Sequence, residues 1–223
     1  MKQSRIFEVY ETDGNRISLF TRNLVPGKSV YGEKLVRSGG VEYRQWDVRK
    51  SKLAATIFKG STNVGIRKDD VVLYLGAASG TTVSHVSDMV GAGGFVFALD
   101  FAPRVVRDLV FLAEERPNIA PLLADANKPL TYIHRVCKAD VVYQDIAQKN
   151  QLEIFLKNVQ LYLKKDGYCL LAVKARSIDV AQKPKALFSE IKQKLEKELT
   201  LIDYRILDPF ELDHAMFICK KTL

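Results

Sequence analysis

The segment Val71-Val72-Leu73-Tyr74-Leu75-Gly76-Ala77-Ala78-Ser79-Gly80-Thr81-Thr82 decides the fold class of this chain. Its five apolar residues predict a short buried strand, and the small residues that follow predict a tight loop opening a helix. Because Gly76 and Gly80 have no side chain, the backbone of this loop can approach a ligand closely. The first turn of the helix offers unpaired N–H groups. Such a segment is typical of the ligand-binding edge of a doubly wound sheet.

Apolar runs alternate with segments of helical periodicity through the rest of the chain. We expect strands at residues 71–75, 95–99, 119–123, 139–143, 168–173, 201–207 and 216–219. We expect helices at residues 81–90, 103–115, 151–162 and 184–198. This alternation predicts an α/β fold, in which a parallel sheet is covered by helices on both faces.

The first quarter of the chain follows a different pattern. Short runs of mixed alternation at residues 5–11 and 16–22 flank the turn residues Thr12-Asp13-Gly14-Asn15, which predicts a β-hairpin. Helical spacing follows at residues 51–58. We therefore expect two parts, a small basic β-rich N-terminal module at residues 1–55 and a Rossmann-like domain at residues 56–223.

Charge and composition limit the classes of function. The formal net charge is +8, and residues 1–60 hold 12 Lys and Arg against 6 Asp and Glu, which predicts either a phosphate-facing surface or a merely solvated one. The three cysteines form no C-x-x-C pair, so we expect no metal site. No apolar run reaches the roughly 18 residues of a bilayer span, and the first residues lead into no secretory segment. We therefore expect a soluble cytoplasmic protein with no membrane partner.

The loop after the first strand departs from the dinucleotide-binding fingerprint. That fingerprint uses Gly-x-Gly-x-x-Gly to admit a pyrophosphate, but here Ala78 and Thr81 occupy the second and third glycine positions. A looser Gly-x-x-x-Gly loop suits the methionine part of S-adenosylmethionine, which carries no phosphate. The same small residues would also suit an ordinary strand–helix turn, so the loop alone leaves both interpretations open.

Acidic residues follow the next three expected strands. They are Asp100, Asp125 and Asp145. A carboxylate after the second strand can bind both hydroxyls of an adenosine ribose, and one after the third can accept from the adenine amino group. Any one of these acids could instead cap the next helix. Their repetition along one edge of the sheet predicts a site for S-adenosylmethionine.

Three polar residues adjoin apolar strands in positions that suit catalysis. Asp145 and Lys174 close two neighbouring strands, and His214 precedes the last one. A lysine at the end of a buried strand requires a partner, and we expect Asp145 to provide it. Such a lysine can take the proton of an alcohol, or stabilise its alkoxide, during alkyl transfer. The alternatives are a structural ion pair for Lys174 and a structural, partly buried His214. We expect His85 and His134 at the surface.

Linked motifs along the chain carry a family resemblance. They are Tyr43-Arg44-Gln45-Trp46-Asp47, Ser51-Lys52-Leu53-Ala54-Ala55, residues 74–88, Pro103-Arg104, Glu114-Glu115-Arg116, Asp145-Ile146-Ala147-Gln148, residues 172–179 and Asp213-His214-Ala215. In this order they resemble the fibrillarin family of RNA 2′-O-methyltransferases, in its short archaeal form. The fold class implied is a Rossmann-like, S-adenosylmethionine-dependent methyltransferase sheet behind a small β-rich module.

The resemblance implies a catalytic set and a cofactor site. The catalytic set falls on Lys52, Asp145, Lys174 and His214. Lys52 comes from the resemblance alone, because its surroundings indicate an exposed helix lysine. Together with the glycine-containing loop, the expected cofactor contacts are Gly76, Ala77, Ser79, Gly80, Thr81, Thr82, Asp100, Phe101, Asp125, Ala126, Asp145, Ile146, Ala147 and Gln148.

The resemblance also implies an assembly. In this family a box C/D guide RNA pairs with the target rRNA or tRNA, a Nop-type scaffold protein docks the enzyme, and a kink-turn-binding protein of ribosomal type holds the guide. The sequence has no Gly/Arg-rich tail of the nucleolar kind, which favours an archaeal-type, cytoplasmic enzyme.

Three other functions remain as alternatives. A methyltransferase of a small molecule or protein side chain would not need the basic N-terminal module or the lysine-centred site. A dinucleotide-dependent oxidoreductase would need the missing middle glycine. A non-catalytic assembly module would not need the complete four-residue catalytic set.

Overall fold

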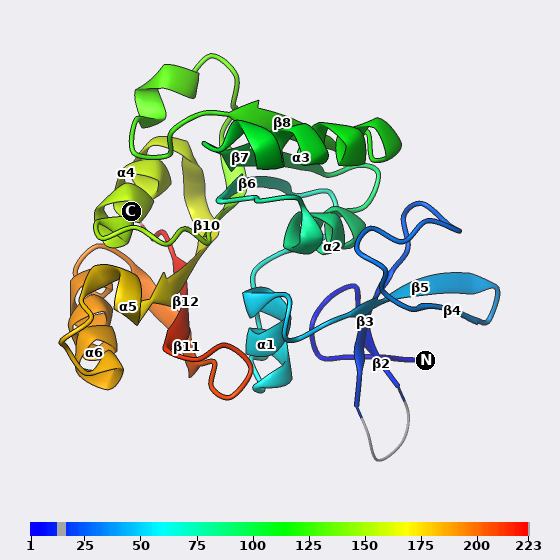
Figure 1. Cartoon of the computed structure of the whole chain (residues 1–223), viewed down its shortest axis with the longest axis horizontal. Coiled ribbons are helices and arrows are strands. Elements are labelled where there is room, and N and C mark those ends of the chain that lie inside the picture. Colours follow the sequence, from blue (N-terminus) through cyan, green and yellow to red (C-terminus); the bar gives the residue numbers. More distant parts are fainter. Residues whose placement is uncertain (13–16, 223) are drawn as a thin grey trace.

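The computed structural model describes residues 1–12 and 17–222. A small antiparallel sheet built from the first residues packs beside a larger domain in which helices cover a twisted sheet (Figure 1). Residues 13–15 of the predicted hairpin turn lie outside the described residues.

The small sheet has five strands in the order β1-β2-β3-β5-β4, all antiparallel. Its strands are β1 Lys2–Gln3, β2 Val9–Glu11, β3 Leu19–Arg22, β4 Leu35–Ser38 and β5 Val41–Trp46. Val9 pairs with Thr21 across β2 and β3, which confirms the predicted hairpin. Gly39 and Gly40 join β4 to β5 with φ values of 58° and 79°, in the left-handed region that tight hairpin turns require.

The main sheet has seven strands in the order β11-β12-β10-β9-β6-β7-β8. Its strands are β6 Val71–Leu75, β7 Phe95–Asp100, β8 Ile119–Leu123, β9 Ala139–Gln144, β10 Leu163–Lys174, β11 Thr200–Ile206 and β12 His214–Lys220. All seven expected strands are confirmed, although β10 begins earlier than expected. The reversal of strand order beside β6 places the loop after β6 at the switch point of the sheet.

One strand contradicts the prediction of a wholly parallel sheet. β12 runs antiparallel to both of its neighbours, β10 and β11. Only residues 207–213 connect β11 to β12, and so short a connection can join antiparallel neighbours but not parallel ones. The reversal brings the start of β12, at His214, to the carboxyl end of β10.

Helices cover both faces of the main sheet, as predicted. Those in the core on one face are α1 Lys52–Phe58, α2 Thr81–Val90 and α3 Pro103–Glu115. Those in the core on the other face are η1 Pro129–Tyr132, α4 Gln151–Tyr162 and α6 Pro184–Leu195, while the short α5 Ala175–Ile178 follows β10. The predicted boundary after residue 55 falls within α1 and stays a prediction. Within the described residues, no helix is long and apolar enough to cross a membrane.

A buried carboxylate joins the small sheet to the domain. Asp88 on α2 accepts from Arg44 of β5 at 2.9 Å and from Arg116 after α3 at 2.7 Å. Thr21 and the backbone N–H of Leu24 also donate to it, at 2.8 and 2.9 Å. The side chains of this ion cluster are at most 1% exposed. Because each carboxylate oxygen has two donors, the buried charge is compensated by the protein itself.

His85 belongs to the same interface, and the prediction that it lies at the surface is wrong. It is fully buried, and its ring stacks on Trp46 with centroids 4.7 Å apart. Its Nδ1 lies 2.7 Å from the Thr21 hydroxyl, and its Nε2 lies 2.8 Å from the Tyr31 hydroxyl. Since Thr21 donates its own proton to Asp88, Nδ1 of His85 carries the hydrogen and donates it to Thr21. The Tyr31 hydroxyl has a single hydrogen for two acceptors, Nε2 of His85 and the Gln45 carbonyl oxygen at 3.0 Å. Burial, with two guanidinium groups nearby, lowers the pKa of His85 well below 6.5, which agrees with a neutral ring.

We predict that Asp88→Ala lowers the free energy of unfolding by about 3–5 kcal/mol, because it leaves the buried guanidinium of Arg116 without a carboxylate and Arg44 with Glu33 alone. Urea denaturation followed by circular dichroism measures this change. The control is Asp108→Ala, which removes an exposed carboxylate and should change the same quantity by less than about 0.5 kcal/mol. Equal effects of the two substitutions would contradict a structural role for Asp88.

Candidate active site

The carboxyl ends of β6, β7 and β9 are tied together by backbone hydrogen bonds. The N–H groups of Gly76 and Ala77 donate to the Leu99 carbonyl at 2.8 and 3.0 Å, and the Asp145 N–H donates to the Leu75 carbonyl at 2.8 Å. Gly76 has a φ of 85°, and a Cβ atom there would lie 2.2 Å from the Asp145 carbonyl oxygen. Glycine is therefore required at this position for both backbone conformation and close packing.

The loop after β6 leaves the start of α2 open. Gly80 is the N-cap of this helix, with a φ of 94°, and no side chain caps the first turn. Ala78 and Ser79 beside it are exposed. The free N–H groups and the positive end of the helix dipole suit an acceptor such as a ligand carboxylate. Thr82 is placed differently from its expected role, because it is buried and donates to the Ser51 hydroxyl at 3.0 Å.

Asp100 closes β7 at the same edge. Its two carboxylate oxygens accept from the backbone N–H groups of Ala78 and Ala102, at 2.9 and 3.0 Å. The carboxylate therefore holds the loop after β6, and each oxygen keeps a lone pair for a ligand hydroxyl. Phe101 follows with 66% of its surface exposed, an unusual setting for a large aromatic side chain.

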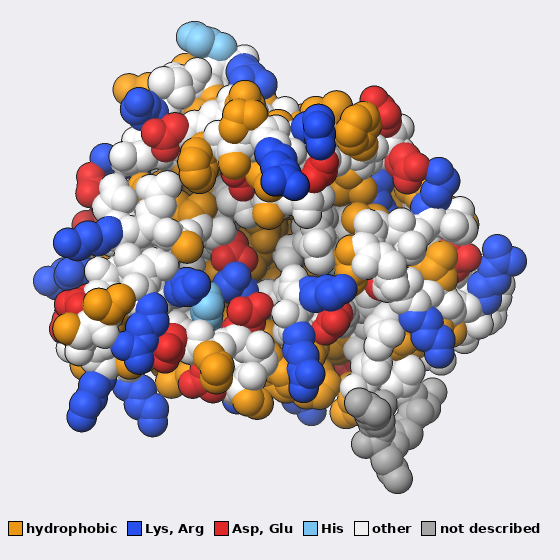
Figure 2. Space-filling model, in the orientation of Figure 1, with side chains coloured by type: hydrophobic (Ala, Val, Ile, Leu, Met, Phe, Trp, Pro, Cys, Tyr) orange, Lys and Arg blue, Asp and Glu red, His pale blue; other side chains and the backbone are white. Residues whose placement is uncertain are grey.

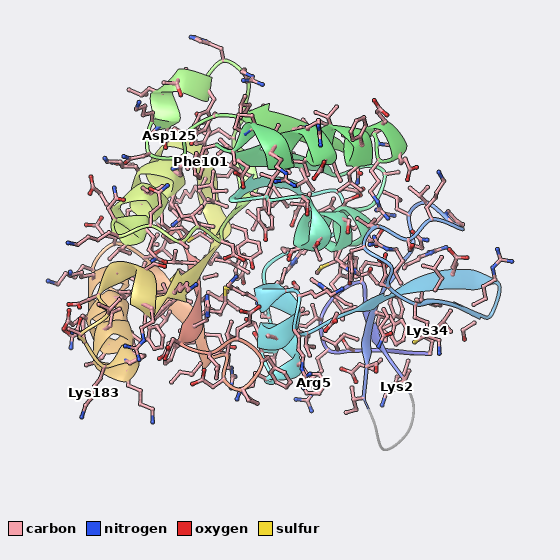
Figure 3. The ribbon with its side chains drawn as sticks, in the orientation of Figure 1. Lys2, Arg5, Lys34, Phe101, Asp125 and Lys183 are labelled. Carbon is pink, nitrogen blue, oxygen red and sulfur yellow. The ribbon has the colours of Figure 1, made fainter. Side chains whose placement is uncertain are left out.

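The remaining expected cofactor residues lie after β8 and β9. Asp125 follows β8, which pairs with β7, so it lies on the strand end next to Phe101 (Figure 3). Ala126, after β8, is buried. In the loop after β9, Ala147 is exposed, and its neighbours Ile146 and Gln148 are half-buried. All four strand ends thus contribute to one open edge, as the sequence predicted.

Lys52 and Asp145 form the ion pair at this edge. The Lys52 Nζ lies 3.1 Å from Oδ1 and 3.2 Å from Oδ2 of Asp145, and each side chain is 20% exposed. Ser51 fixes the start of α1, because its hydroxyl accepts from the Ala54 N–H. The surroundings of Lys52 in the sequence indicated an exposed helix lysine, and that interpretation is wrong.

Lys174 is not the partner of Asp145, which corrects our expectation. β9 and β10 are neighbours as predicted, but their register aligns Leu171 with Gln144. Lys174 therefore extends about two residues, or roughly 7 Å, beyond the level of Asp145. Its side chain is exposed, and in the part of the chain that the structure describes it forms no ion pair.

His214 lies directly opposite Lys174 in the pairing of β10 with β12. It is 7% exposed, and its Nδ1 lies 2.7 Å from the Leu212 carbonyl oxygen. Because a carbonyl can only accept, Nδ1 carries the hydrogen and Nε2 has a free lone pair. Burial lowers the pKa of His214, and the positive charge of Lys52 lowers it further. The hydrogen bond to the Leu212 carbonyl raises the pKa, but by less than burial lowers it.

Gln151, the first residue of α4, was missed in the sequence. It is fully buried, and its Oε1 accepts from the Lys174 N–H at 3.3 Å. Its Nε2 donates to the carbonyls of Gln148 and Lys174, at 2.9 and 3.4 Å. This amide connects the loop after β9 to the end of β10, so it positions two expected functional segments. The only signal in the sequence is an uncharged amide at a helix start.

The edge forms a recess on the face of the molecule shown in Figure 2. Basic, acidic and histidine side chains gather at its rim, and hydrophobic side chains lie deeper in the recess. Among the described residues, no cluster of His, Cys, Asp and Glu is arranged to hold a metal ion. The chemistry available is a paired carboxylate and ammonium, a second exposed ammonium and a neutral imidazole.

Comparison with known proteins gives consistent relatives. The fibrillarin family model matches residues 1–223. A fibrillarin-like rRNA/tRNA 2′-O-methyltransferase of Methanocaldococcus jannaschii is 48% identical over 222 residues, which cover 98% of this chain and 96% of that protein.

Two solved structures are similar in fold and sequence. Aeropyrum pernix fibrillarin, in complex with natively bound S-adenosyl-L-methionine, superposes with a TM-score of 0.89 at 42% identity, covering 98% of this chain and 96% of that one. A fibrillarin solved in complex with Nop5p superposes with a TM-score of 0.88 at 41% identity, covering 97% and 98%.

We predict that the pKa of His214 lies below 6.5, so that the ring is neutral at pH 6.5 and above. Its pKa is lowered chiefly by burial, so the ring gains a proton only at lower pH than an ordinary histidine. NMR titration of the imidazole carbon-bound protons measures this, with His214→Ala to assign the signal. A midpoint at or above pH 6.5 would show that the ring is hydrated or paired with an anion.

Proposed function

This chain belongs to the fibrillarin family, and from that premise we propose that it methylates ribose 2′-hydroxyls of RNA, using S-adenosylmethionine. The observation that carries the proposal is the convergence of Lys52, Asp145, Lys174 and His214 beside an open loop at the carboxyl edge of one sheet. A small-molecule methyltransferase could share the loop, but its relatives would not be RNA methyltransferases along the whole chain.

The residues at the edge fit the cofactor. The uncapped start of α2 suits the methionine carboxylate, and Asp100 suits the ribose hydroxyls. Exposed Phe101 offers a flat apolar surface to the adenine ring, and Asp125 offers an acceptor to its amino group. When bound, the cofactor supplies a methyl group activated by a sulfonium charge.

The catalytic side chains divide the work on the hydroxyl. The Lys52 ammonium contacts both oxygens of the Asp145 carboxylate. Asp145 is thereby kept in one orientation beside the cofactor loop. Within the described residues Lys174 has no ion-pair partner, so its side chain can act on the ribose hydroxyl. As an ammonium it would stabilise the developing oxyanion, and as the neutral amine it would take the proton of the hydroxyl. Neutral His214, opposite Lys174, presents a lone pair that can accept a hydrogen bond from the same hydroxyl. Because the reaction is a displacement, holding the hydroxyl in line supplies much of the rate.

The proposed setting is a box C/D ribonucleoprotein particle. The complex of a relative with Nop5p supports docking on a Nop-type scaffold protein. The guide RNA, the rRNA and tRNA targets, the kink-turn-binding protein and a cytoplasmic location follow from the family resemblance. A methyl-transfer assay with labelled cofactor tests the whole proposal, by comparing the chain alone with the chain plus guide RNA and partner proteins. Site-specific methylation only in the full assembly is expected, and none under either condition would overturn it.

We predict that Asp100→Ala weakens cofactor binding by about 1.5–3 kcal/mol, because a charged acceptor for the ribose hydroxyls is lost. Isothermal titration calorimetry measures the change. Asp100→Asn is the matched variant, since it keeps one acceptor for the backbone and should lose less affinity. Unchanged affinity in both variants would show that Asp100 only accepts from the backbone N–H groups of Ala78 and Ala102 and does not contact the cofactor.

We predict that Lys174→Ala lowers the single-turnover rate of methyl transfer by about 10²–10⁴-fold and leaves cofactor affinity nearly unchanged, because the ammonium acts on the hydroxyl. The assay uses the assembled particle and a parallel cofactor titration. The control is Lys165→Ala, which removes an exposed lysine from the opposite end of β10. Near-normal turnover of the Lys174 variant would contradict the role, and a collapse of cofactor affinity would move Lys174 into the cofactor pocket.

A further inference from the structure

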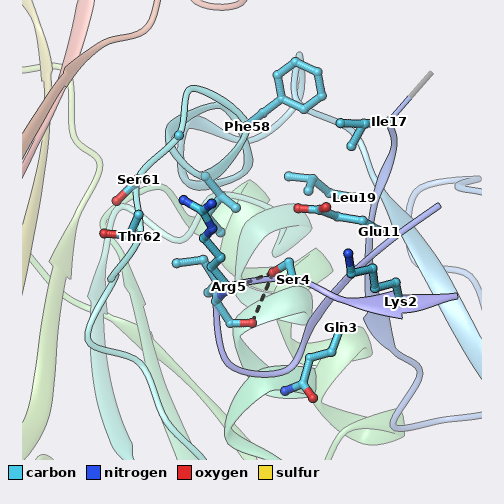
Figure 4. Close-up of a pocket in the computed structure, with 13 residues that line it drawn as sticks. Lys2, Gln3, Ser4, Arg5, Glu11, Ile17, Leu19, Phe58, Ser61 and Thr62 are labelled. Carbon is cyan, nitrogen blue, oxygen red and sulfur yellow. Dashed lines mark hydrogen bonds between the residues drawn. The ribbon is translucent and has the colours of Figure 1, made fainter. Parts of the chain in front are cut away.

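Two adjoining hollows lie where the small sheet meets α1. The first, of about 560 Å³, is bordered by Lys2, Arg5, Glu11 and Phe58 (Figure 4). The second, of about 730 Å³, is bordered by Tyr31, Lys34, Trp46, Arg49, Lys50 and Phe210. They adjoin at Ile17, Leu19 and Phe58, and we call the two hollows together the N-terminal trough.

Basic side chains dominate the N-terminal trough. They are Lys2, Arg5, Lys34, Arg49 and Lys50. All are exposed, and within residues 1–12 and 17–222 none of them forms an ion pair. Lys50 instead lies over the Tyr31 ring, 5.2 Å from its centroid. Unpaired cations along a depression attract a linear polyanion more strongly than a single charge would.

The acids of the trough reduce this charge only in part. Glu33 is bound by buried Arg44 at 2.6 Å, so its charge is already compensated. Asp47 accepts from the backbone N–H of Arg49, and Glu11 lines the first hollow. The trough therefore keeps a net positive charge, which agrees with the excess of Lys and Arg in residues 1–60.

Trp46 provides a second, independent observation. It lines the second hollow and is 1% exposed, and its indole N–H has no hydrogen-bond partner among the described residues. A buried donor without an acceptor costs about 1–3 kcal/mol. The indole nitrogen is not accessible from the trough, but the ring lies in its wall, so the emission of Trp46 can report a ligand bound there.

The second hollow of the N-terminal trough is lined by residues that adjoin Lys52 and His214 in the sequence. Arg49 and Lys50 immediately precede Ser51 and Lys52, at the start of α1. On its other side Phe210 packs edge-to-face on Phe58, with centroids 5.3 Å apart, and lies four residues before His214. The wall of the second hollow is therefore continuous in sequence with the segments that carry Lys52 and His214.

We propose that the N-terminal trough binds the sugar–phosphate backbone of the RNA strand next to the methylated nucleotide. This inference rests on the proposed function, and it adds the path of the substrate. Phosphates would lie against the five cations. The trough reads no sequence, because it offers charges to the backbone and no arrangement of base-specific donors and acceptors.

The test compares two charge-matched triple variants of the full chain. The trough variant is Lys34→Gln, Arg49→Gln and Lys50→Gln. The control variant is Lys183→Gln, Lys185→Gln and Lys194→Gln, in which three exposed lysines on or beside α6 are removed. Both lose three positive charges, so a difference between them reports the position of the charge. Figure 3 shows Lys34 and Lys183 at opposite ends of the molecule.

The first measurement is the binding of a fluorescein-labelled, unstructured 12-nucleotide RNA between about 50 and 200 mM KCl. Each phosphate contact contributes about 0.7 to the slope of log K against log salt for single strands. The trough variant should show a slope shallower by about 2, and the control variant the wild-type slope. Trp46 is the only tryptophan of the chain, so RNA should also change its emission in the wild type and the control. Equal slopes in the two variants would overturn the inference.

The second measurement is photo-crosslinking in the assembled particle, with 4-thiouridine beside the target nucleotide. Crosslinks to residues 31–50 are expected. Crosslinks of the RNA only to other segments, with residues 31–50 covered by the Nop-type protein, would overturn the inference. Failure of methyl transfer in the particle, with RNA still bound in the trough, would contradict the proposed function and leave the trough in place.

Discussion

The buried carboxylate of Asp88 is the constraint on which the rest of the molecule depends. Two guanidinium groups, Arg44 from the small sheet and Arg116 from the end of α3, contact it directly. Loss of Asp88 would leave Arg116 buried without a carboxylate, and loss of Arg44 would leave Glu33 without its guanidinium, so the pairing holds the small sheet in a single position against α2. Because β5 ends at Trp46 and α1 begins at Lys52, that position determines where Lys52 lies. A buried charge cluster on α2 thereby helps to position Lys52, to which we assign a catalytic role.

The active site is assembled from chain segments that are distant in sequence. β9 ends just before Asp145 and β10 ends at Lys174, because parallel strands bring their carboxyl ends to one edge. His214 joins them only because β12 runs in the opposite direction, so that its first residue meets the last residue of β10. Lys52 neutralises Asp145, and this leaves Lys174 free for the substrate. The RNA path that we propose along the N-terminal trough would give the small sheet a function beyond support.

Prediction from sequence succeeded where the information was local. Apolar periodicity located the strands and helices of the main domain, since burial imposes a period that each segment shows by itself. The small-residue loop at Gly76 and the acids after successive strands indicated the cofactor edge for the same reason. The order of motifs indicated the family, which the family model and the relatives confirm. The partner of Asp145 was predicted wrongly, because adjacency of strands does not specify their register.

The sequence by itself determined the fold class, the edge at which a ligand binds and the residue types available there. Only the tertiary structure decided the direction of β12, the pairing of Lys52 with Asp145, the burial of His85 and the contacts of Gln151. Each of these depends on side chains that meet across large separations in the chain, so no window of neighbouring residues contains them. His85 shows the reason most clearly. Its face of α2 is buried only because the small sheet packs against it, and the sequence of the helix does not contain that information.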